Sequence, residues 1–420
     1  MNRSNKNKTI LILGAGPDQL PIYKAARRRG LTILGADGRP NSVARPWADH
    51  FLHIQTTTGA EIVRLLGDTV PNGVVSPGND SFHRAIYDLT HYYNLPQLLT
   101  WTAVEASCNK AYFCEQLRRQ GICAPRGKSN QDPARLAAYA QAIGFPLIVK
   151  PIDASGNKGV TCVQQATDFA PALDRAFANS PQKHVLVEEY IEGAHGGIEV
   201  FRLHGKTKLM AMSQRHHSGP PDFLTLKHVV GLPIREELRQ KMTCGVNKIC
   251  QTFGIDNGPL NLDFVVRDGT IYFLEMGARL SGNGFPFLVK QCYGWDTYDL
   301  ALQLALGELD GKTIAAPVQQ NIGGILIIKT AVSGILKQFQ HLDTIRQHPA
   351  FVEEHLFVRP GDLVTAFSQA NHRLGYFMVA SPHLAEIEEV LRIFEEQFSV
   401  VVTQPTVEPQ PTVEPQPVSV

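Results

Sequence analysis

The chain has 420 residues, which corresponds to about three domains. Hydrophobic residues make up 43% and charged residues 19%, proportions that are ordinary for a soluble protein with large buried cores. Forty Lys and Arg residues nearly balance 39 Asp and Glu residues, and the net charge of +1 removes the electrostatic argument for a dedicated nucleic-acid or membrane-surface binder.

The cysteines and the N-terminal segment favour a reducing compartment. The seven cysteines are odd in number and form neither a CxxC pair nor a zinc pattern, so we expect no disulfide framework. The apolar run at residues 10–13 is too short for a signal-peptide core, and no stretch approaches the roughly 18 apolar residues of a membrane helix. We therefore expect a cytoplasmic protein that binds neither nucleic acid nor membranes.

The first part of the chain alternates between strands and helices. Residues 8–14 form a short apolar run closed by Gly, residues 19–29 predict a helix, and residues 31–37 and 73–76 predict further strands. This alternation predicts βαβ units and a doubly wound sheet. We assign residues 1–108 to a Rossmann-like α/β domain.

This domain contains half of a dinucleotide-binding fingerprint. Gly14 and Gly16 follow the first strand, and Asp37 ends the second. Such glycines surround a pyrophosphate, and such an acid binds a ribose hydroxyl. Because Gln19 stands in place of the third glycine, we favour a strand-to-helix turn that lines a substrate site over NAD binding.

The central region is α+β. Helices are predicted at residues 109–125, 133–143 and 168–179, and strands at residues 145–150, 159–163 and 184–191. Residues 198–214 and 260–275 alternate as antiparallel strands do, and Asp268-Gly269 between two apolar runs indicates a hairpin. The remaining chain predicts a strand at 321–329 and an amphipathic helix at 384–398. The tail, 404–420, repeats PTVEPQ, which predicts a disordered extension without a role in activity.

A small-residue loop follows the strand that ends in Lys150. Ser155, Gly156 and Gly159 lie within this loop. Backbone N–H groups of such a loop can surround phosphate oxygens, and the strand-end lysine adds a point charge. The alternative is a plain hairpin with a solvated lysine. On the phosphate interpretation, Lys150→Ala weakens binding of the phosphate-bearing ligand and leaves thermal stability nearly unchanged.

Two further stretches carry acidic residues on apolar strands. In VEEYIEG, residues 187–193, backbone groups of a domain connector could match the edge of adenine, although an ordinary edge strand is the alternative. Asp263 and Glu275 lie on the two strands of the hairpin, where paired carboxylates suit Mg²⁺. Arg279 is placed to hold a carboxylate or phosphoryl group, and the alternative is a structural ion-pair network.

Together and in this order, these features resemble the ATP-grasp superfamily. The resemblance covers roughly residues 8–310 and includes Asn109-Lys110, FPLIVKP, VEEYIEG and LDFVVRDGTIYFLEMGAR. It implies an ATP-grasp domain at 109–314, with a lid at about 126–190, after the Rossmann-like domain. Residues 315–403 resemble the C-terminal α/β subdomain of free-standing amino-acid ligases.

The resemblance implies a role for each matching residue. Lys110 and Lys150 contact ATP phosphates, Ser155, Gly156 and Gly159 form the lid loop, and Glu188 and Ile191 meet adenine through backbone atoms. Glu199 is a weaker match for an acid directed at the ribose or the metal. Asp263 and Glu275 hold Mg²⁺, and Arg279 stabilises the acyl phosphate or the substrate carboxylate, which makes Arg279 and Lys150 the catalytic candidates.

One position departs from the family pattern. Many relatives have an Asn between the hairpin Glu and the Arg, and here Gly277 takes its place. Asn261 and Asn283 are candidates for the missing metal ligand, and this Asn is also absent from a subset of amino-acid ligases. The run at 279–284 resembles a substrate-binding turn.

The expected activity is an ATP- and Mg²⁺-dependent carboxylate–amine ligase that forms an amide through an acyl phosphate and releases ADP and phosphate. The alternative is a carboxylase-like or nucleotide-biosynthetic enzyme that works through carboxyphosphate. The partners are a small carboxylate and a small amine, with amino acids favoured, and a homodimer is considered.

Residues near the substrates are less determined. Arg215 could bind a carboxylate, with His216 or His217 taking the amine proton, while Asp80 could bind an ammonium and His195 the ribose. A solvated loop is the alternative for each.

Overall fold

The computed structural model describes residues 8–309 and 314–403, and the predicted tail at 404–420 lies outside them. The N-terminal sheet is parallel, in the order β3-β2-β1-β4. Its elements are β1 (Thr9–Leu13), α1 (Leu20–Arg28), β2 (Thr32–Asp37), β3 (His50–His53), α2 (Gly59–Leu66), β4 (Gly73–Val75) and α3 (His83–Tyr92). Strands β1, β2 and β4 are buried on both faces, as the near-continuous apolar runs predicted, whereas the edge strand β3 is partly exposed.

A helix from much later in the chain completes this domain. On one face of the sheet, Ile10 and Ile12 pack with α1 and with α10 (Thr297–Ala305). On the other face, Leu11 and Leu13 pack with α2 and α3. The N-terminal core therefore depends on residues beyond the predicted boundary at 108.

Two helices, α4 (Trp101–Cys108) and α5 (Lys110–Arg119), connect this domain to the lid. The helix predicted over 109–125 ends at Arg119. Gly121 adopts φ 69°, and the backbone N–H of Ile122 donates to the carbonyl of Leu117 at 2.9 Å. This left-handed termination satisfies the last helical carbonyls, and it ends the helix before Pro125 can.

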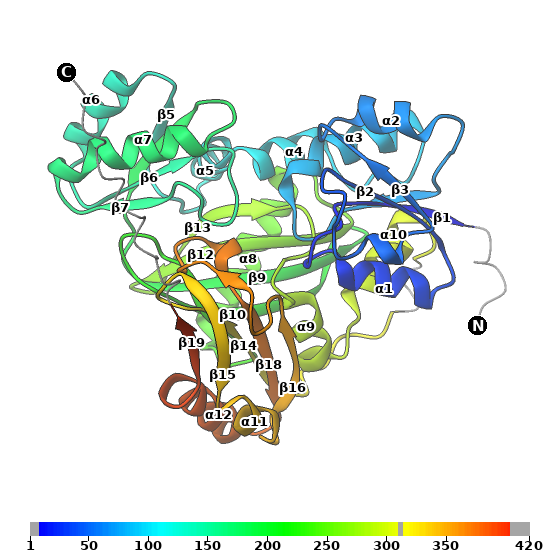
Figure 1. Cartoon of the computed structure of the whole chain (residues 1–420). Helices are drawn as coiled ribbons and strands as arrows, with labels where there is room; N and C mark the ends of the chain where they lie inside the picture. The colour runs from blue at the N-terminus through cyan, green and yellow to red at the C-terminus, as the bar shows by residue number, and fades with distance from the viewer. Residues whose placement is uncertain (1–7, 310–313, 404–420) are drawn as a thin grey trace, which may run out of the picture.

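The lid is a small antiparallel sheet in the order β5-β8-β6-β7, with two helices packed on it. Its elements are β5 (Gly127–Asn130), α6 (Pro133–Ile143), β6 (Leu147–Pro151), β7 (Thr161–Val163), α7 (Phe169–Asn179) and β8 (Val185–Glu189). Figure 1 shows the lid at the upper left, apart from the N-terminal domain at the right. The loop between β6 and β7 is the predicted phosphate loop.

The centre of the molecule is an eight-stranded antiparallel sheet in the order β13-β12-β9-β10-β11-β14-β18-β16. Its strands are β9 (Ala194–Leu203), β10 (Lys206–His217), β11 (Thr225–Val230), β12 (Gly258–Arg267), β13 (Thr270–Gly277), β14 (Ile322–Ile328), β16 (Phe351–Leu356) and β18 (Gly375–Ser381). The helices α5 and α8 (Glu236–Thr252) cover one face, and α9 (Phe285–Tyr293) covers the other. Asp268 and Gly269, both with positive φ, make the predicted hairpin turn between β12 and β13.

The C-terminal part continues this sheet. Strand β14 pairs with β11, so the central sheet extends past the predicted domain boundary at residue 314. A further three-stranded sheet consists of β15 (Gly334–Gln340), β17 (Leu363–Val364) and β19 (Ser399–Thr403), next to α11 (Leu342–Arg346) and α12 (Leu384–Glu396). Figure 1 shows this part below the central sheet. Within the described ranges, none of the helices has the length and apolar character needed to cross a membrane.

Candidate active site

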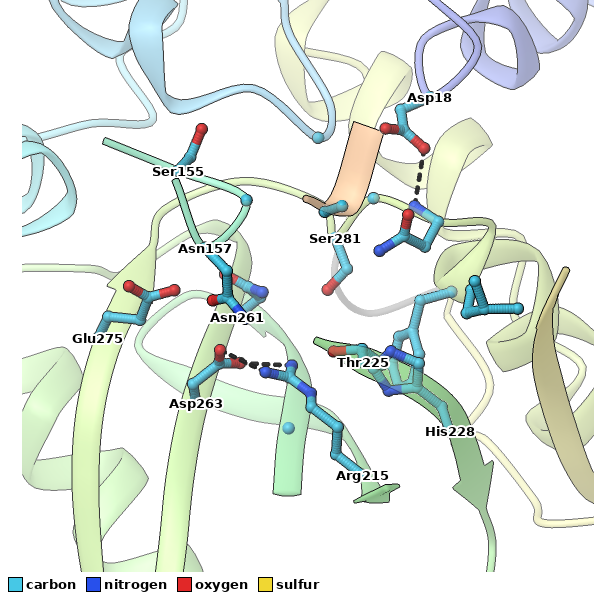
Figure 2. A pocket seen from close by; sticks show the side chains of 18 of the residues that line it. Asp18, Ser155, Asn157, Arg215, Thr225, His228, Asn261, Asp263, Glu275 and Ser281 are labelled. Carbon is cyan, nitrogen blue, oxygen red and sulfur yellow. Dashed lines mark hydrogen bonds and ion pairs between the residues drawn. The ribbon is translucent and has the colours of Figure 1, made fainter. Parts of the chain in front are cut away.

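Two pockets meet at the loop between β6 and β7. We call the first the lid pocket; its lining includes Lys110, Ile148, Lys150, Glu188, Tyr190, Ile191, His195, His217, Phe223 and Leu274. We call the second the central cavity; its lining includes Asp18, Asp80, Thr225, His228, Asn261, Arg279, Ser281, Asn283, Phe285, Phe367 and Arg373. Both are lined by Ser155, Gly156, Asn157, Arg215, Asp263 and Glu275. Figure 2 shows Ser155 and Asn157 opposite the two acids.

The lid pocket contains a group of aromatic rings. His195 stacks on Phe223 with 5.8 Å between the ring centroids, and His217 meets both rings edge-on. Burial, together with the nearby His217 and Arg215, lowers the pKa of His195 to about 4, so the ring is neutral at pH 7. Neutral rings beside the buried Ile191 suit a flat, apolar group such as a nucleobase.

Two lysines enter the lid pocket, and each contacts an acid. The Nζ of Lys150 lies 2.6 Å from Glu188, and both side chains are buried. Burial alone would lower the pKa of Lys150, but the Glu188 carboxylate raises it, so the lysine is charged. The Nζ of Lys110 donates to the carbonyl of Ala154 at 2.6 Å and lies 3.3 Å from Glu275. Both lysines thus line one pocket together with Glu188 and Ile191.

The two hairpin acids lie where the pockets join. Asp263 and Glu275 are opposite each other in the register of β12 and β13. Arg215 donates to both oxygens of Asp263 at 2.5 and 2.6 Å, as Figure 2 shows. Arg215 is therefore engaged by Asp263, rather than lying free in a loop.

These acids fit Mg²⁺ bound together with phosphates. Among the described residues there is no group of three or more His, Cys, Asp or Glu that could hold a metal by itself. Mg²⁺ commonly takes one or two carboxylates and completes its shell with water and substrate phosphates. Asp263 and Glu275 supply two carboxylates next to the phosphate loop, and this donor set suits such an ion.

Arg279 joins the hairpin to the N-terminal domain. Its Nη2 donates to Asp80 at 2.7 Å, and both residues line the central cavity. Burial alone would raise the pKa of Asp80, but Arg279 and His83 lower it, so Asp80 is ionised at neutral pH. Asp263, Glu275 and Arg279 therefore each form an ion pair, but with Arg215, Lys110 and Asp80 rather than with one another.

Gly277 lies close to three side chains that line the central cavity or face it. A Cβ at this position would lie 2.8 Å from the Oδ1 of Asn261, 2.9 Å from the Oδ1 of Asp80 and 3.0 Å from the Cζ of Arg279. Such distances are too short for a side chain without movement of its neighbours. Asn261 is opposite Gly277 in the strand register. Its amide therefore lies beside the position at which many relatives have an Asn.

Several sequence candidates line neither pocket, namely Glu199, Gly159 and His216 and, in the N-terminal domain, Gly14, Gly16 and Asp37. Glu199 is completely buried on β9, where its Oε2 accepts from the backbone N–H of Ser281 at 3.0 Å. Burial raises the pKa of Glu199 to about 7. This contact holds the turn at 279–284. The predicted contact with the ribose or the metal would require the carboxyl group of Glu199 to line one of the two pockets. Gly159 turns the end of the loop against Asn179 and Pro151.

Among the residues of the central cavity that the sequence analysis missed are the ionisable side chains of Asp18, His228 and Arg373. Asp18 lies in the turn after β1, which was expected to line a substrate site, but the acid itself was not singled out. His228 is buried on β11 against Phe285, and burial holds its pKa well below the usual value, so it is neutral. Arg373 precedes β18 and had no local signal.

Comparisons with known proteins agree with this geometry. Residues 143–286 match the family model of the ATP-grasp domain, and residues 328–403 match that of L-amino acid ligase C-terminal domain 2. The L-amino acid ligase from Bacillus licheniformis is 20% identical with a TM-score of 0.83, covering 96% of this chain and 100% of that one. Phosphoribosylglycinamide synthetase from Anaerococcus prevotii is 21% identical with a TM-score of 0.75, covering 94% and 100%.

A relative found by sequence is the uncharacterized protein y4rH of Sinorhizobium fredii. It is 23% identical over 333 residues, which are 78% of this chain and 68% of that protein. At these identities the solved structures establish the fold, while the two family models identify the domains. The predictions of an ATP-grasp ligase and of its mixed α/β fold are confirmed at this level. The chain contains an ATP-grasp domain followed by an L-amino acid ligase C-terminal domain.

Proposed function

We propose that the protein is an ATP-dependent ligase that joins a carboxylate to an amine through an acyl phosphate and releases ADP and phosphate. The observation that carries this proposal is the junction of the two pockets. One pocket has the aromatic rings and lysines suited to a nucleotide, and the other is lined by arginines and acids. Both open onto Asp263 and Glu275, where a phosphoryl group could pass from one substrate to the other.

The lid pocket is assigned to ATP. The adenine lies among His195, His217 and Phe223, next to the connector that contains Ile191. Lys110 and Lys150 neutralise phosphate charge, and the backbone of the β6–β7 loop surrounds the phosphates. Bound Mg²⁺ supplies charge neutralisation of the phosphates, and Asp263 and Glu275 are the side chains that would hold it.

The central cavity is assigned to the acid and the amine. Arg279 attracts the carboxylate, and Asp80 beside it is an ionised partner for an ammonium group. The carboxylate oxygen attacks the γ-phosphorus, and ADP leaves as the β–γ bond breaks. The amine nitrogen then attacks the acyl carbon, phosphate leaves with the C–O electron pair, and the amine loses a proton to solvent.

Water must be kept from the acyl phosphate, because hydrolysis would waste it. The loop containing Ser155, Gly156 and Asn157 lies over both pockets and is the segment that closes the junction. Here the chain holds and aligns the reactants, since phosphoryl transfer depends on positioning and electrostatics and needs no enzyme nucleophile.

The test is release of ADP and phosphate from ATP and Mg²⁺ with pooled amino acids, with and without bicarbonate, followed by mass spectrometry of the products. The proposal expects release that requires an acid–amine pair, with a new amide in the products. Release that requires bicarbonate alone would support the carboxyphosphate alternative. Formation of AMP in place of ADP would contradict the proposal.

A further inference from the structure

Three arginine–carboxylate pairs line the central cavity, and the proposed reaction uses two of them. The Arg215–Asp263 and Arg279–Asp80 pairs lie at the hairpin, next to the pocket junction. The third pair joins Arg373, from the C-terminal part, to Asp18, from the N-terminal domain. Neither the phosphoryl transfer nor nucleotide binding accounts for this pair.

The third pair is also the loosest. A single nitrogen, the Nη2 of Arg373, lies 3.3 and 3.2 Å from the two oxygens of Asp18, whereas the corresponding distances in the other pairs are 2.5 to 2.7 Å. The Oδ1 of Asp18 also accepts from the backbone N–H of Asn283 at 2.8 Å. Asp18 therefore has a second, closer partner, and it satisfies Arg373 only in part.

Arg373 is held in place and still has donors available. Its Nη1 donates to the carbonyl of Ala370 at 3.1 Å, and its guanidinium lies over Phe357, 5.2 Å from the ring centroid. Its Nε is buried and has no hydrogen-bond partner among the described residues. A fixed guanidinium with unused N–H groups is suited to two-point recognition of a carboxylate.

The pair lies across the cavity from the reaction junction. Figure 2 shows Asp18 on the opposite side of the cavity from Glu275 and Asp263. The lid loop reaches the segment that carries Arg373, because a Cβ on Gly156 would lie 3.7 Å from the Cβ of Ala370. An amine whose nitrogen attacks near the hairpin would extend its other end in this direction.

The geometry points to Arg373 as the anchor for a carboxylate on the amine substrate, with Asp18 as the positioning residue that holds the guanidinium ready. The amine substrate is then itself an amino acid, or another amine that carries an acid group. This inference rests on the proposed function and narrows the substrate class of the same site. It also gives the C-terminal part of the chain a direct place in substrate recognition.

The kinetic test compares wild-type protein, Arg373→Gln and the surface control Arg359→Gln, whose side chain is 88% exposed. The amine found in the pooled assay is compared with its carboxamide, which lacks the negative charge. We expect Arg373→Gln to raise the KM for the free-acid amine at least about tenfold, the loss of one charge-assisted contact. The KM values for ATP, the acid and the carboxamide should stay within about twofold.

The inference is overturned if Arg373→Gln raises the KM of the amine substrate and of its carboxamide equally. It is also overturned if the KM that rises is that of the carboxylate substrate that receives the phosphoryl group. Either result would leave the ligase reaction standing. A second readout works without turnover: calorimetry with a non-hydrolysable ATP analogue, Mg²⁺ and single amino acids. We expect two amino-acid sites per chain in wild type and Arg359→Gln, and one site in Arg373→Gln.

Calorimetry also separates this inference from the proposed reaction. If the wild-type protein makes no amide but shows two sites, one of which depends on Arg373, the reaction fails and the anchor stands. If no amino acid gives a site that depends on Arg373, the anchor is wrong whether or not an amide forms.

Discussion

The lid pocket and the central cavity share a wall but are built differently. The lid pocket is formed by the start of α5, the lid and its connector, the ends of β9 and β10 with the loop that carries Phe223, and the hairpin, all within residues 110–275. The central cavity takes Asp18 and Asp80 from the N-terminal domain and Arg373 from the C-terminal part. The pocket proposed for the nucleotide is thus built from neighbouring motifs, whereas the cavity proposed for the acid and the amine depends on how distant segments assemble.

The ion pairs of the two pockets show the same contrast between local and long-range contacts. In the lid pocket, Lys150 and Glu188 are neighbours on adjacent strands of one small sheet. In the central cavity, two of the arginine–acid pairs cross between domains. Damage to the lid pocket should therefore affect ATP binding and local stability, and damage to the cavity should affect acid and amine binding.

The largest expected effect is at the junction. Glu275→Gln removes a carboxylate from the proposed Mg²⁺ site, and we expect ADP formation to fall at least about 100-fold. The Glu275 side chain is 42% exposed and paired with Lys110, so stability should change by less than about 1 kcal/mol. Steady-state kinetics and thermal unfolding check this, with the exposed Glu192→Gln as control. Full activity in Glu275→Gln would remove the metal assignment.

The next largest effect is expected at Lys150, where substitutions distinguish a role in folding stability from a role in ATP binding. The sequence-based expectation that Lys150→Ala leaves stability nearly unchanged is corrected by the structure, because the mutation strands the buried Glu188 carboxylate. We now expect a loss of about 3–5 kcal/mol in the free energy of unfolding. The double variant Lys150→Met/Glu188→Leu should recover most of the stability. It should still bind ATP at least about tenfold more weakly.

Calorimetry and urea unfolding of the single and double variants provide the measurement. Wild-type affinity for ATP in the double variant would show that Lys150 is purely structural. Wild-type stability in the single variant would show that the Lys150–Glu188 pair does not form.

A pH-dependent effect tests the position of Glu199. Burial raises its pKa from 4.5 to about 7, so folding takes up a proton between these values. The resulting stabilisation is present below pH 4.5 and is lost as the pH rises through 7. Wild-type protein should therefore lose about 3 kcal/mol more stability than Glu199→Gln between pH 5 and pH 8.

Urea unfolding at a series of pH values measures this difference. Because Glu199 lines neither pocket, ATP affinity in Glu199→Gln should stay within about twofold of wild type. A tenfold loss of ATP affinity in Glu199→Gln would support the original prediction that Glu199 contacts the ribose or the metal.

The smallest expected effect is at the aromatic wall of the lid pocket. Phe223→Leu keeps an apolar side chain but removes the ring that stacks on His195. We expect the Kd for ATP to rise about three- to tenfold, as for the loss of one aromatic contact of about 1 kcal/mol. The Kd for free amino acids should not change. If Phe223→Leu changed only the Kd for amino acids, the lid pocket would be the amino-acid site and the assignment to ATP would be wrong.

The elements that local patterns specify were predictable from the sequence. The buried parallel strands, the Asp268-Gly269 hairpin and the lid strands follow from apolar runs and turn residues. The acids Asp263 and Glu275 stood out because carboxylates are rare on apolar strands. Helices such as α8 and α10 were missed, and α10 packs on a domain that is distant in sequence.

The residues of the proposed carboxylate anchor could not be predicted for a related reason. Asp18 and Arg373 are separated by most of the chain, and their pairing follows from packing between domains. Glu199 was predicted to face the ribose or the metal from a weak family match after the connector, and that match gave no sign of its partner, the backbone N–H of Ser281 in the 279–284 turn. Tertiary partners of this kind have no signature in local sequence.

The central claim is that a carboxylate in the central cavity receives the phosphoryl group from ATP in the lid pocket. The direct measurement uses amino acids labelled with ¹⁸O in both carboxylate oxygens, with ATP and Mg²⁺, and mass spectrometry of the released phosphate. Transfer through an acyl phosphate predicts one ¹⁸O atom in each phosphate formed with the amide. Amide formation with unlabelled phosphate would contradict the account.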